Sequence, residues 1–152
     1  MHKTTPEEVM LGFDFGMKRI GIAIGDTLTN TAKPLTTISA KDGIPQWSQI
    51  DALIQEWKIN SMVVGMPYRL DGTSQDITRS ATKFLNRLKA KFSLPVFFMD
   101  ERLTTKVAKI ELQRHDKKNV SIDSMAATLI LQSWLNQRNI NSGGITIDSS
   151  SC

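Results

Sequence analysis

A short apolar run near the N-terminus, VMLGFDF at residues 9–15, restricts the fold more than any other segment of this chain. It contains a single charged side chain, Asp14, and the pattern is typical of a strand buried in the middle of a sheet. A turn leads to a second apolar run, IGIAIG at 20–25, in which Gly21 and Gly25 indicate close approach by another stretch of backbone. The two runs predict adjacent central strands.

Beyond these strands, apolar periodicity predicts alternating helices and strands around one core. The expected strands are a weak one at 35–39 and two further ones at 62–64 and 95–99. Between the first two strands we expect a helix with Ile50, Leu53, Ile54 and Trp57 on one face, and between the last two a helix that begins at the capping box Thr73-x-x-Asp76 and carries an apolar stripe of Ile77, Ala81, Phe84, Leu85 and Leu88. After the strand at 95–99 come a helix from Thr104 or Thr105 to about His115 and a last helix with Ile122, Met125, Ala126, Leu129 and Ile130 on its inner face. This order, β-β-β-α-β-α-β-α-α, predicts an α/β fold. Its mixed five-stranded sheet has three antiparallel strands followed by βα units, with helices on both faces.

Length and composition restrict the class of protein. At 152 residues the chain fits one domain, which we place at 9–138 between a flexible N-terminus at 1–8 and a flexible Asn-, Ser- and Gly-rich tail at 139–152. The single cysteine, Cys152, supports neither a disulfide framework nor a thiolate metal site. No apolar run approaches the length of a membrane span, and the first residues lack the apolar region of a secretory signal. We therefore expect a cytoplasmic protein without a membrane partner.

Positive charge is concentrated in one part of the sequence. Residues 79–118 hold eleven Lys or Arg against four acids, a net charge of +7, whereas the remainder has eight against eleven, a net charge of −3. Such asymmetry suits a polyanionic partner such as nucleic acid. On charge alone, solvated helix faces are the simpler interpretation, so the partner has to be argued from other residues.

Asp14 is the most informative acidic residue. A carboxylate within a buried strand is costly unless it is hydrogen-bonded, paired with a charge or bound to a cation. The alternative to a functional role is that Asp14 marks the end of the strand and accepts hydrogen bonds from the turn at 16–19. Lys18 and Arg19 in that turn either contact a phosphate backbone or are simply exposed turn residues.

Further acids lie at the boundaries of predicted core elements. Asp100 and Glu101 follow the strand at 95–99, at the end where ligands of α/β sheets collect, and Asp123 falls in the first turn of the last helix. Each has a structural alternative, because Asp100 can lie in a loop or cap a helix, and Asp123 suits the helix dipole. Together, Asp14, Glu101 and Asp123 predict a site for Mg²⁺ or Mn²⁺, the hard cations that oxygen ligands prefer and that promote phosphodiester cleavage. No Walker, serine-nucleophile or His-Glu-x-x-His zinc motif occurs in the chain.

Four longer segments are distinctive in combination. They are GFDFGMKRIGIAIGD (12–26), VVGMPYRLDGTSQDITRSATKFLNRL (63–88), DERLTT (100–105) and IDSMAATLILQSWL (122–135). These segments, which together span nearly the whole domain, resemble the YqgF-type family of Holliday-junction-resolvase-like proteins, to which pre-16S rRNA nuclease activity is assigned. The first and third segments are highly specific when they occur together.

The resemblance implies a ribonuclease H-like nuclease that matures the 5′ end of the small-subunit rRNA and depends on a divalent metal. The family's acidic positions correspond to Asp14, Glu101 and Asp123, as metal ligands and catalytic residues, with Asp26 as an accessory acid. The segment at 63–88 looks like a surface that positions nucleic acid. The expected nucleic-acid contacts are Lys18, Arg19, Arg79, Lys83, Arg87, Arg102 and Lys106. The expected partner is structured precursor rRNA, and a homodimer is a further expectation.

One position departs from related junction resolvases, which often place a second acid or a histidine three residues after the last aspartate. That position is Ala126 here, so a second metal ion is expected to bind weakly or only with substrate. The sequence leaves two alternative functions open. A DNA junction resolvase would be favoured by a two-fold dimer, and Ala126 favours a non-catalytic nucleic-acid-binding or transcription-associated module. An actin-like ATPase, suggested by the pattern D-x-G-x-x-x-x-G, needs two lobes that this length cannot supply.

Overall fold

The computed structural model describes residues 7–66, 75–100 and 121–142. The strands are β1 (Val9–Asp14), β2 (Arg19–Asp26), β3 (Thr31–Lys41), β4 (Ile44–Pro45), β5 (Ser61–Met66) and β6 (Val96–Asp100). The helices are α1 (Trp47–Trp57), α2 (Gln75–Phe92) and α4 (Ile122–Ser142). In this described part of the chain, no helix is both long and apolar enough to cross a membrane.

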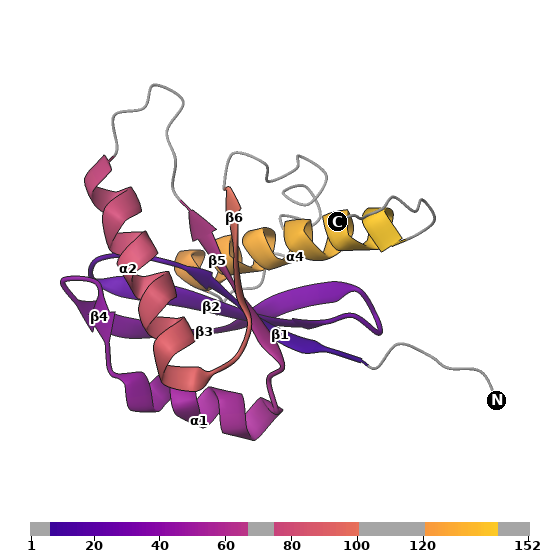
Figure 1. The fold of residues 1–152 in the computed structure, drawn as a ribbon, viewed down its shortest axis with the longest axis horizontal. Coiled ribbons are helices and arrows are strands. Elements are labelled where there is room, and N and C mark those ends of the chain that lie inside the picture. Colours follow the sequence, from indigo (N-terminus) through magenta and orange to yellow (C-terminus); the bar gives the residue numbers. More distant parts are fainter. Residues whose placement is uncertain (1–6, 67–74, 101–120, 143–152) are drawn as a thin grey trace.

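The strand order β4-β3-β2-β1-β5-β6 places β1 inside the sheet. β1, β2 and β3 pair antiparallel, whereas β5 pairs parallel with β1 and β6 pairs parallel with β5. This is the predicted meander followed by βα units, with helices on both faces of the sheet (Figure 1). Because β1, β5 and β6 run in the same direction, Asp14 and Asp100 end their strands at the same edge of the sheet.

The sequence predicted five strands, and the structure adds the two-residue strand β4 at one edge of the sheet. The chain leaves β3 through Asp42 and Gly43, whose φ angles are 54° and 80°. Two consecutive residues with positive φ form the tight hairpin turn that an Asp-Gly pair favours. The signal for this hairpin was therefore present in the sequence, although β4 pairs with β3 at only two positions.

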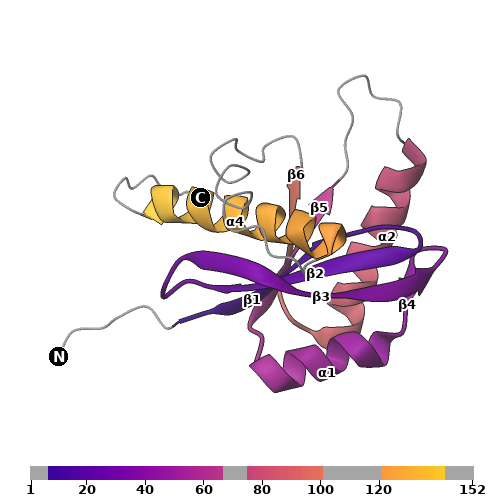
Figure 2. The same ribbon diagram turned by 180° about the vertical axis from the view of Figure 1, so that it is seen from behind.

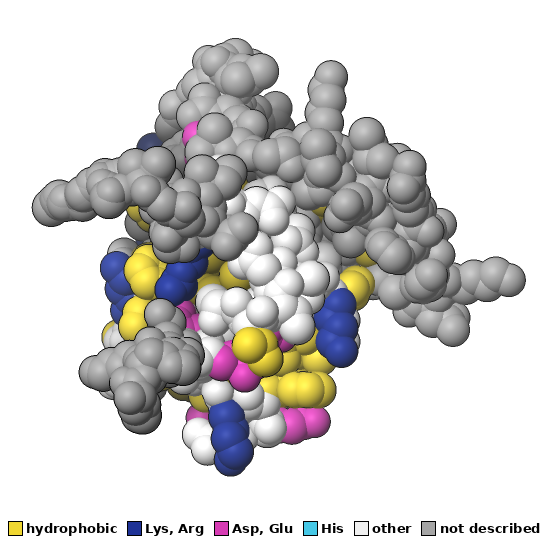
Figure 3. All heavy atoms as spheres, turned by 90° about the vertical axis from the view of Figure 1, so that its right-hand side faces the viewer, with side chains coloured by type: hydrophobic (Ala, Val, Ile, Leu, Met, Phe, Trp, Pro, Cys, Tyr) yellow, Lys and Arg dark blue, Asp and Glu magenta, His cyan; other side chains and the backbone are white. Residues whose placement is uncertain are grey.

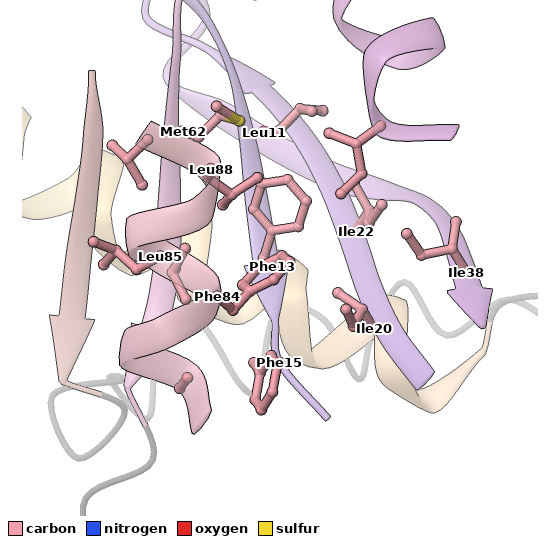
Figure 4. Packing of buried hydrophobic residues seen from close by; sticks show 14 of the residues in the cluster. Leu11, Phe13, Phe15, Ile20, Ile22, Ile38, Met62, Phe84, Leu85 and Leu88 are labelled. Carbon is pink, nitrogen blue, oxygen red and sulfur yellow. The ribbon is translucent and has the colours of Figure 1, made fainter. Parts of the chain in front are cut away.

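One face of the sheet is covered by α1 and α2, with large apolar side chains packed between the layers (Figure 4). Phe84 of α2 is fully buried at the centre of a cluster of aromatic rings. Its ring centroid lies 5.5 Å from that of Phe13, 5.3 Å from that of Phe15 and 5.8 Å from that of Trp47. Each large apolar side chain buried here stabilises the fold by about 1.5–3 kcal/mol relative to its exposed state.

The opposite face is covered by α4, which packs across β1, β2 and β3 (Figure 2). Here the sheet presents small residues to the helix. A Cβ atom built on Gly12 would lie 2.7 Å from Leu131 Cβ, and one built on Gly25 would lie 3.1 Å from Leu131 Cδ2. A larger residue at Gly12 would push α4 away, so this glycine of β1 sets how closely the helix approaches, whereas at Gly25 the flexible end of Leu131 could move aside.

The inner face of α4 differs from the predicted one. Ile122 is 84% exposed, and of the five residues expected to face inward only Ile130 is buried. The buried positions are Ser124, Ala127, Thr128, Ile130, Leu131, Ser133 and Leu135. The glycine-lined surface of the sheet admits small and hydroxyl side chains, and Thr128 satisfies its hydroxyl by donating to the Ser124 carbonyl at 2.7 Å. Apolar periodicity cannot identify such a face, because hydroxyl residues occupy part of it.

Glu8 and the end of α4 are tied together next to the boundaries predicted for the domain. α4 continues to Ser142, beyond the expected boundary at 138, and the Glu8 carboxylate pairs with Arg138 at 2.9 Å. The Glu8 N–H also donates to Thr27 Oγ1 at 2.9 Å. Two predicted features, the helix ending near residue 115 and the Thr73 side of the capping box, lie outside the described residues.

Candidate active site

Asp14 ends β1 between two glycines. In the register of the sheet it is paired with Gly21 of β2 on one side and with Gly65 of β5 on the other. Side chains alternate along a strand and Gly12 faces Leu131 of α4, so Asp14 projects from the same face of the sheet. Neither neighbour in the register has a side chain. There is therefore space on both sides of the half-buried Asp14 carboxylate, on the face that α4 covers.

Gly21 brings Asp123 to the same place. A Cβ atom on Gly21 would overlap the backbone carbonyl of Asp123, so the first turn of α4 rests directly on β2 at this point. Gly21 is also the registered partner of Asp14. Asp14 and Asp123, which are far apart in the sequence, are therefore both neighbours of Gly21, on one face of the sheet.

Ser121 holds the first turn of α4 in position. Its Oγ accepts a hydrogen bond from the Ser124 N–H at 3.0 Å, as the side chain of an N-cap residue does. The same Oγ lies 2.6 Å from the hydroxyl oxygen of Thr37 in β3. This network ties the start of α4, including Asp123, to the sheet, and confirms the predicted place of Asp123 in the first helical turn.

Arg19, the first residue of β2, contacts the Asp123 carboxylate. Its Nε donates to Asp123 Oδ2 at 3.0 Å, and the two side chains are 66% and 31% exposed. An ion pair with this exposure contributes at most about 1 kcal/mol to stability. Its main effect is to orient the carboxylate and to place a positive charge beside the acids, where a phosphate group would approach. Lys18, the preceding residue, is exposed.

Asp100 reaches the same edge of the sheet but faces the other way. Val96 packs into the core beneath α1 and α2, whereas Met99 packs into the core beneath α4. Strand alternation therefore places the half-buried Asp100 on the α1 and α2 face. Asp100 does not share a face with Asp14 and Asp123.

Three predicted site residues, Glu101, Arg102 and Lys106, lie outside the described residues. Asp26, the expected accessory acid, is described and lies at the far end of β2. Its Oδ1 accepts hydrogen bonds from the Thr29 N–H at 2.8 Å and from the Thr29 hydroxyl at 3.0 Å. Asp26 therefore stabilises the turn between β2 and β3, at the opposite end of β2 from Gly21 and Asp123.

Arg79, Lys83 and Arg87 form an exposed stripe with a spacing of four residues along α2. This helix covers the face of the sheet opposite α4, and it begins at the side where β5 and β6 end (Figure 1). Only the start of the stripe, at Arg79, therefore lies towards the edge that carries the acids. Arg79 Nη1 also lies 3.7 Å from Asp76 Oδ1. On the face drawn in Figure 3, Lys and Arg side chains are scattered among apolar and acidic ones rather than gathered in one patch.

The chemistry of the described acids suits a hard cation. Asp14 and Asp123 offer carboxylate oxygens, the ligand type that Mg²⁺ and Mn²⁺ prefer. Within the ranges that the structure describes, no three Asp, Glu, His or Cys side chains lie close enough to hold an ion. The carboxylates of Asp14 and Asp123 could supply two of the oxygen ligands of such an ion, which commonly takes its others from water or substrate phosphates.

Proteins with similar sequences identify the family. The family model described as "RuvX: Holliday junction resolvase" matches residues 8–137. A "Putative pre-16S rRNA nuclease" of Coxiella burnetii is 46% identical over 132 residues, which cover 86% of this chain and 94% of the relative. A protein of the same name from Saccharophagus degradans is 47% identical over 134 residues, again covering 86% of this chain and 94% of the relative.

Solved structures share the fold at much lower identity. "T. thermophilus RuvC in complex with Holliday junction substrate" superposes with a TM-score of 0.60 at 13% identity, covering 86% of this chain and 95% of that chain. A second structure of Thermus thermophilus RuvC gives a TM-score of 0.53 at 12% identity, covering 86% of this chain and 95% of that chain. The expected ribonuclease H-like fold is thereby confirmed.

Proposed function

This chain belongs to the RuvX family of Holliday junction resolvases, and from that membership we propose that it is a nuclease that hydrolyses phosphodiester bonds in the 5′-end processing of precursor 16S rRNA. The observation that carries the proposal is that Asp14 and Asp123 are both neighbours of Gly21, at the edge where the parallel strands end. The choice of rRNA as substrate rests on the relatives named as pre-16S rRNA nucleases, which match almost their whole length.

We assign Asp14, Glu101 and Asp123 as the residues that would hold Mg²⁺ or Mn²⁺. Glu101 is included because it follows β6 directly in the chain, after a strand that ends at the same edge as β1. When bound, such an ion activates water and neutralises charge on the phosphate oxygens. Asp14 on an inner strand and Asp123 on a capped helical turn present their oxygens from rigid elements, which lowers the cost of assembling the site.

Arg19 would serve two purposes in this site. Its ion pair orients Asp123, and a guanidinium has five N–H donors, so the bond to Asp123 leaves donors for a substrate phosphate. Lys18, which is exposed next to Arg19, would contact a neighbouring phosphate in the backbone of the nucleic-acid substrate. Ala126 is half-buried in α4 and offers no ligand atom. We therefore expect a second metal ion to bind only with substrate.

A DNA four-way junction is the second candidate substrate, because the matching family model carries the name of a Holliday junction resolvase. A junction presents two equivalent cleavage positions, so this activity would require a two-fold homodimer. Processing of precursor rRNA requires no such symmetry. We place the protein in the cytoplasm, together with its precursor rRNA.

The deciding experiment measures cleavage of precursor 16S rRNA, with Mg²⁺ or Mn²⁺, by the wild type and by Asp14→Asn. Asparagine keeps the size of the side chain and removes the negative charge. Since loss of residues that merely orient metal ligands costs about 10- to 100-fold, loss of a ligand should reduce cleavage by more than about 100-fold. The matched control is Asp26→Asn, the same exchange at the far end of β2, which should cleave like the wild type. Equal cleavage by the wild type and Asp14→Asn would refute the proposal.

The same three proteins should be tested on a four-way DNA junction. Metal-dependent cleavage of the junction, with intact rRNA, would reassign the activity to DNA. Retained binding of rRNA without any cleavage by the wild type would make the chain a non-catalytic binding module. Binding to either substrate should weaken steeply as salt rises, because basic side chains displace counterions from the phosphates.

A further inference from the structure

A second concave site lies at the opposite end of the parallel strands from the acids. It is a groove of about 540 Å³ bounded by the residues that begin β5, those that lead into β6 and the C-terminal half of α4. Ser61 in its wall is registered with Met10, whereas Gly65 is registered with Asp14. Four residues of β5, or about 13 Å, therefore separate the groove from the candidate active site.

Two polar atoms in the wall of this groove are buried without a partner. Neither Ser61 Oγ nor Trp134 Nε1 forms a hydrogen bond to any residue that the structure describes. Ser61 is only 3% exposed, so its hydroxyl is also withdrawn from bulk solvent. Buried donors without acceptors are costly and uncommon in folded proteins. An acceptor supplied to Trp134 and a hydrogen-bonding atom supplied to Ser61 would satisfy both atoms.

Phe97 gives the groove a flat apolar wall. Its ring centroid lies 5.0 Å from that of Trp134, with 23° between the ring planes, and Phe97 is 38% exposed. A planar ring lying edge to edge with Trp134 can stack on the part of Phe97 that the indole leaves uncovered. Stacking of this kind accepts any flat ring, and the Trp134 N–H then selects a ring with an acceptor at its edge.

Charge at the rim narrows the class of ligand. Glu7 and Glu8 both line the groove, and Arg138, the one cation among the lining residues that the structure describes, is paired with Glu8 at 2.9 Å. This negative charge disfavours a phosphate group inside the groove, so the phosphates of any strand would have to lie outside it, and it favours a molecule with N–H or O–H donors. A nucleobase with an exocyclic amino group offers both a ring acceptor and such donors, whereas the aromatic rings of peptide side chains such as Phe and Tyr lack a ring acceptor.

We propose that this groove binds an unpaired nucleobase, stacked on Phe97 and hydrogen-bonded to Trp134 and Ser61. The base is carried either by a free nucleoside or by a single-stranded stretch of RNA. The second source rests on the proposed nuclease function, whereas the groove and its unpartnered atoms do not. A strand held here would be anchored at a fixed distance from the acids on the same face of the sheet.

The test is a titration of isotope-labelled Asp14→Asn protein, followed through the indole N–H signals of its tryptophans. The probes are adenosine, a single-stranded oligoadenylate RNA, and ribose 5-phosphate, which has no base. Adenosine or the oligonucleotide should shift the Trp134 indole signal and leave those of Trp47 and Trp57 in place. Ribose 5-phosphate should shift none of them.

Variants then separate the two contacts. Trp134→Phe keeps an aromatic ring and removes the N–H, so its binding is followed through backbone amide signals instead. It should weaken binding about two- to tenfold, the usual effect of one lost hydrogen bond. Phe97→Leu keeps an apolar side chain and removes the stacking surface, and should weaken binding by more than about fivefold. Trp57→Phe, a matched exchange at a partly exposed position of α1, should bind like the parent protein. The dispersion of the amide spectrum verifies that each variant is folded.

Binding of adenosine would establish a nucleoside site, and binding of the oligonucleotide alone would establish a site for an unpaired base within a strand. An unshifted Trp134 signal with both probes at millimolar concentration would overturn the proposal, as would an equal shift with ribose 5-phosphate. Because the measurement uses a variant blocked in cleavage, it is independent of the nuclease assay. Failure of the proposed function would therefore leave a positive binding result intact.

Discussion

The two faces of the sheet are built in opposite ways. Beneath α1 and α2, large side chains such as Phe13 and Phe84 fill the space between the layers. Beneath α4, Gly12 and Gly21 bring the helix almost onto the strand backbone. The first face removes a large apolar area from water, whereas the second holds Asp123 beside Asp14.

This difference indicates that one face of the sheet contributes most of the stability, whereas the other positions the acids of the candidate site. Packing of large side chains tolerates small shifts, because neighbouring groups can partly relax into a new arrangement. A helix that rests on glycine has no side chain between it and the strand to absorb a change. Substitutions on the first face should therefore lower stability, and those on the second should also lower activity per folded molecule.

The largest effect is expected for Phe84→Ala. Loss of this fully buried ring should reduce the free energy of unfolding by about 3–5 kcal/mol, as large-to-small substitutions in a core do. Denaturant unfolding measures the loss, and cleavage per folded molecule, assayed at low temperature, should stay close to that of the wild type. A proportionate loss of cleavage per folded molecule would mean that the two faces are not separable.

Gly21→Ala should have a smaller effect on stability and a larger one on cleavage. The added methyl group would overlap the Asp123 carbonyl, so we expect a loss of about 1–3 kcal/mol in stability. Displacing Asp123 by about 1 Å should reduce cleavage per folded molecule by up to about 100-fold. Gly25→Ala is the matched control, because its methyl group would lie 2.7 Å from the Thr31 carbonyl, away from the acids. If both variants keep full activity per folded molecule, the glycine contact does not position the site.

Ser121→Ala tests the cap that begins α4. Removing the hydroxyl takes away the acceptor for the Ser124 N–H and the link to Thr37, and should cost about 1 kcal/mol of stability. Thermal unfolding measures the loss. Ser48→Ala, at an exposed position of α1, should change stability little, so an equal loss in both variants would argue against a specific role of the cap.

The smallest effect on stability is expected for Arg19→Gln. The exposed ion pair with Asp123 contributes at most about 1 kcal/mol, so unfolding should hardly change. Removing a positive charge that competes for the carboxylate should instead lower the Mg²⁺ concentration that gives half-maximal cleavage. Lys18→Gln, the neighbouring exposed charge, should change this metal requirement less. An unchanged metal requirement in Arg19→Gln would show that the guanidinium does not compete with the ion at Asp123.

The sequence by itself determined the framework of this protein. The apolar runs at 9–15 and 20–25 predicted buried strands, and the periodic segments after them predicted the order of helices and strands. The acids Asp14 and Asp123 were identified because charge at the boundary of a buried element is costly without a partner. The distinctive segments also identified the family.

Only the tertiary structure decided which groups meet. In the tertiary structure, the inner face of α4 packs against the glycines of the sheet. Asp26 lies in a turn far from the other acids, and Asp100 lies on the face of the sheet opposite Asp14. The structure also revealed the groove with Ser61 and Trp134 in its wall. The physical reason is that local periodicity reports whether a residue is buried but not what it is buried against. The packing partner of a buried residue depends on contacts between segments that are distant in the chain. At this site those contacts are made by backbone atoms, which the pattern of apolar side chains does not report.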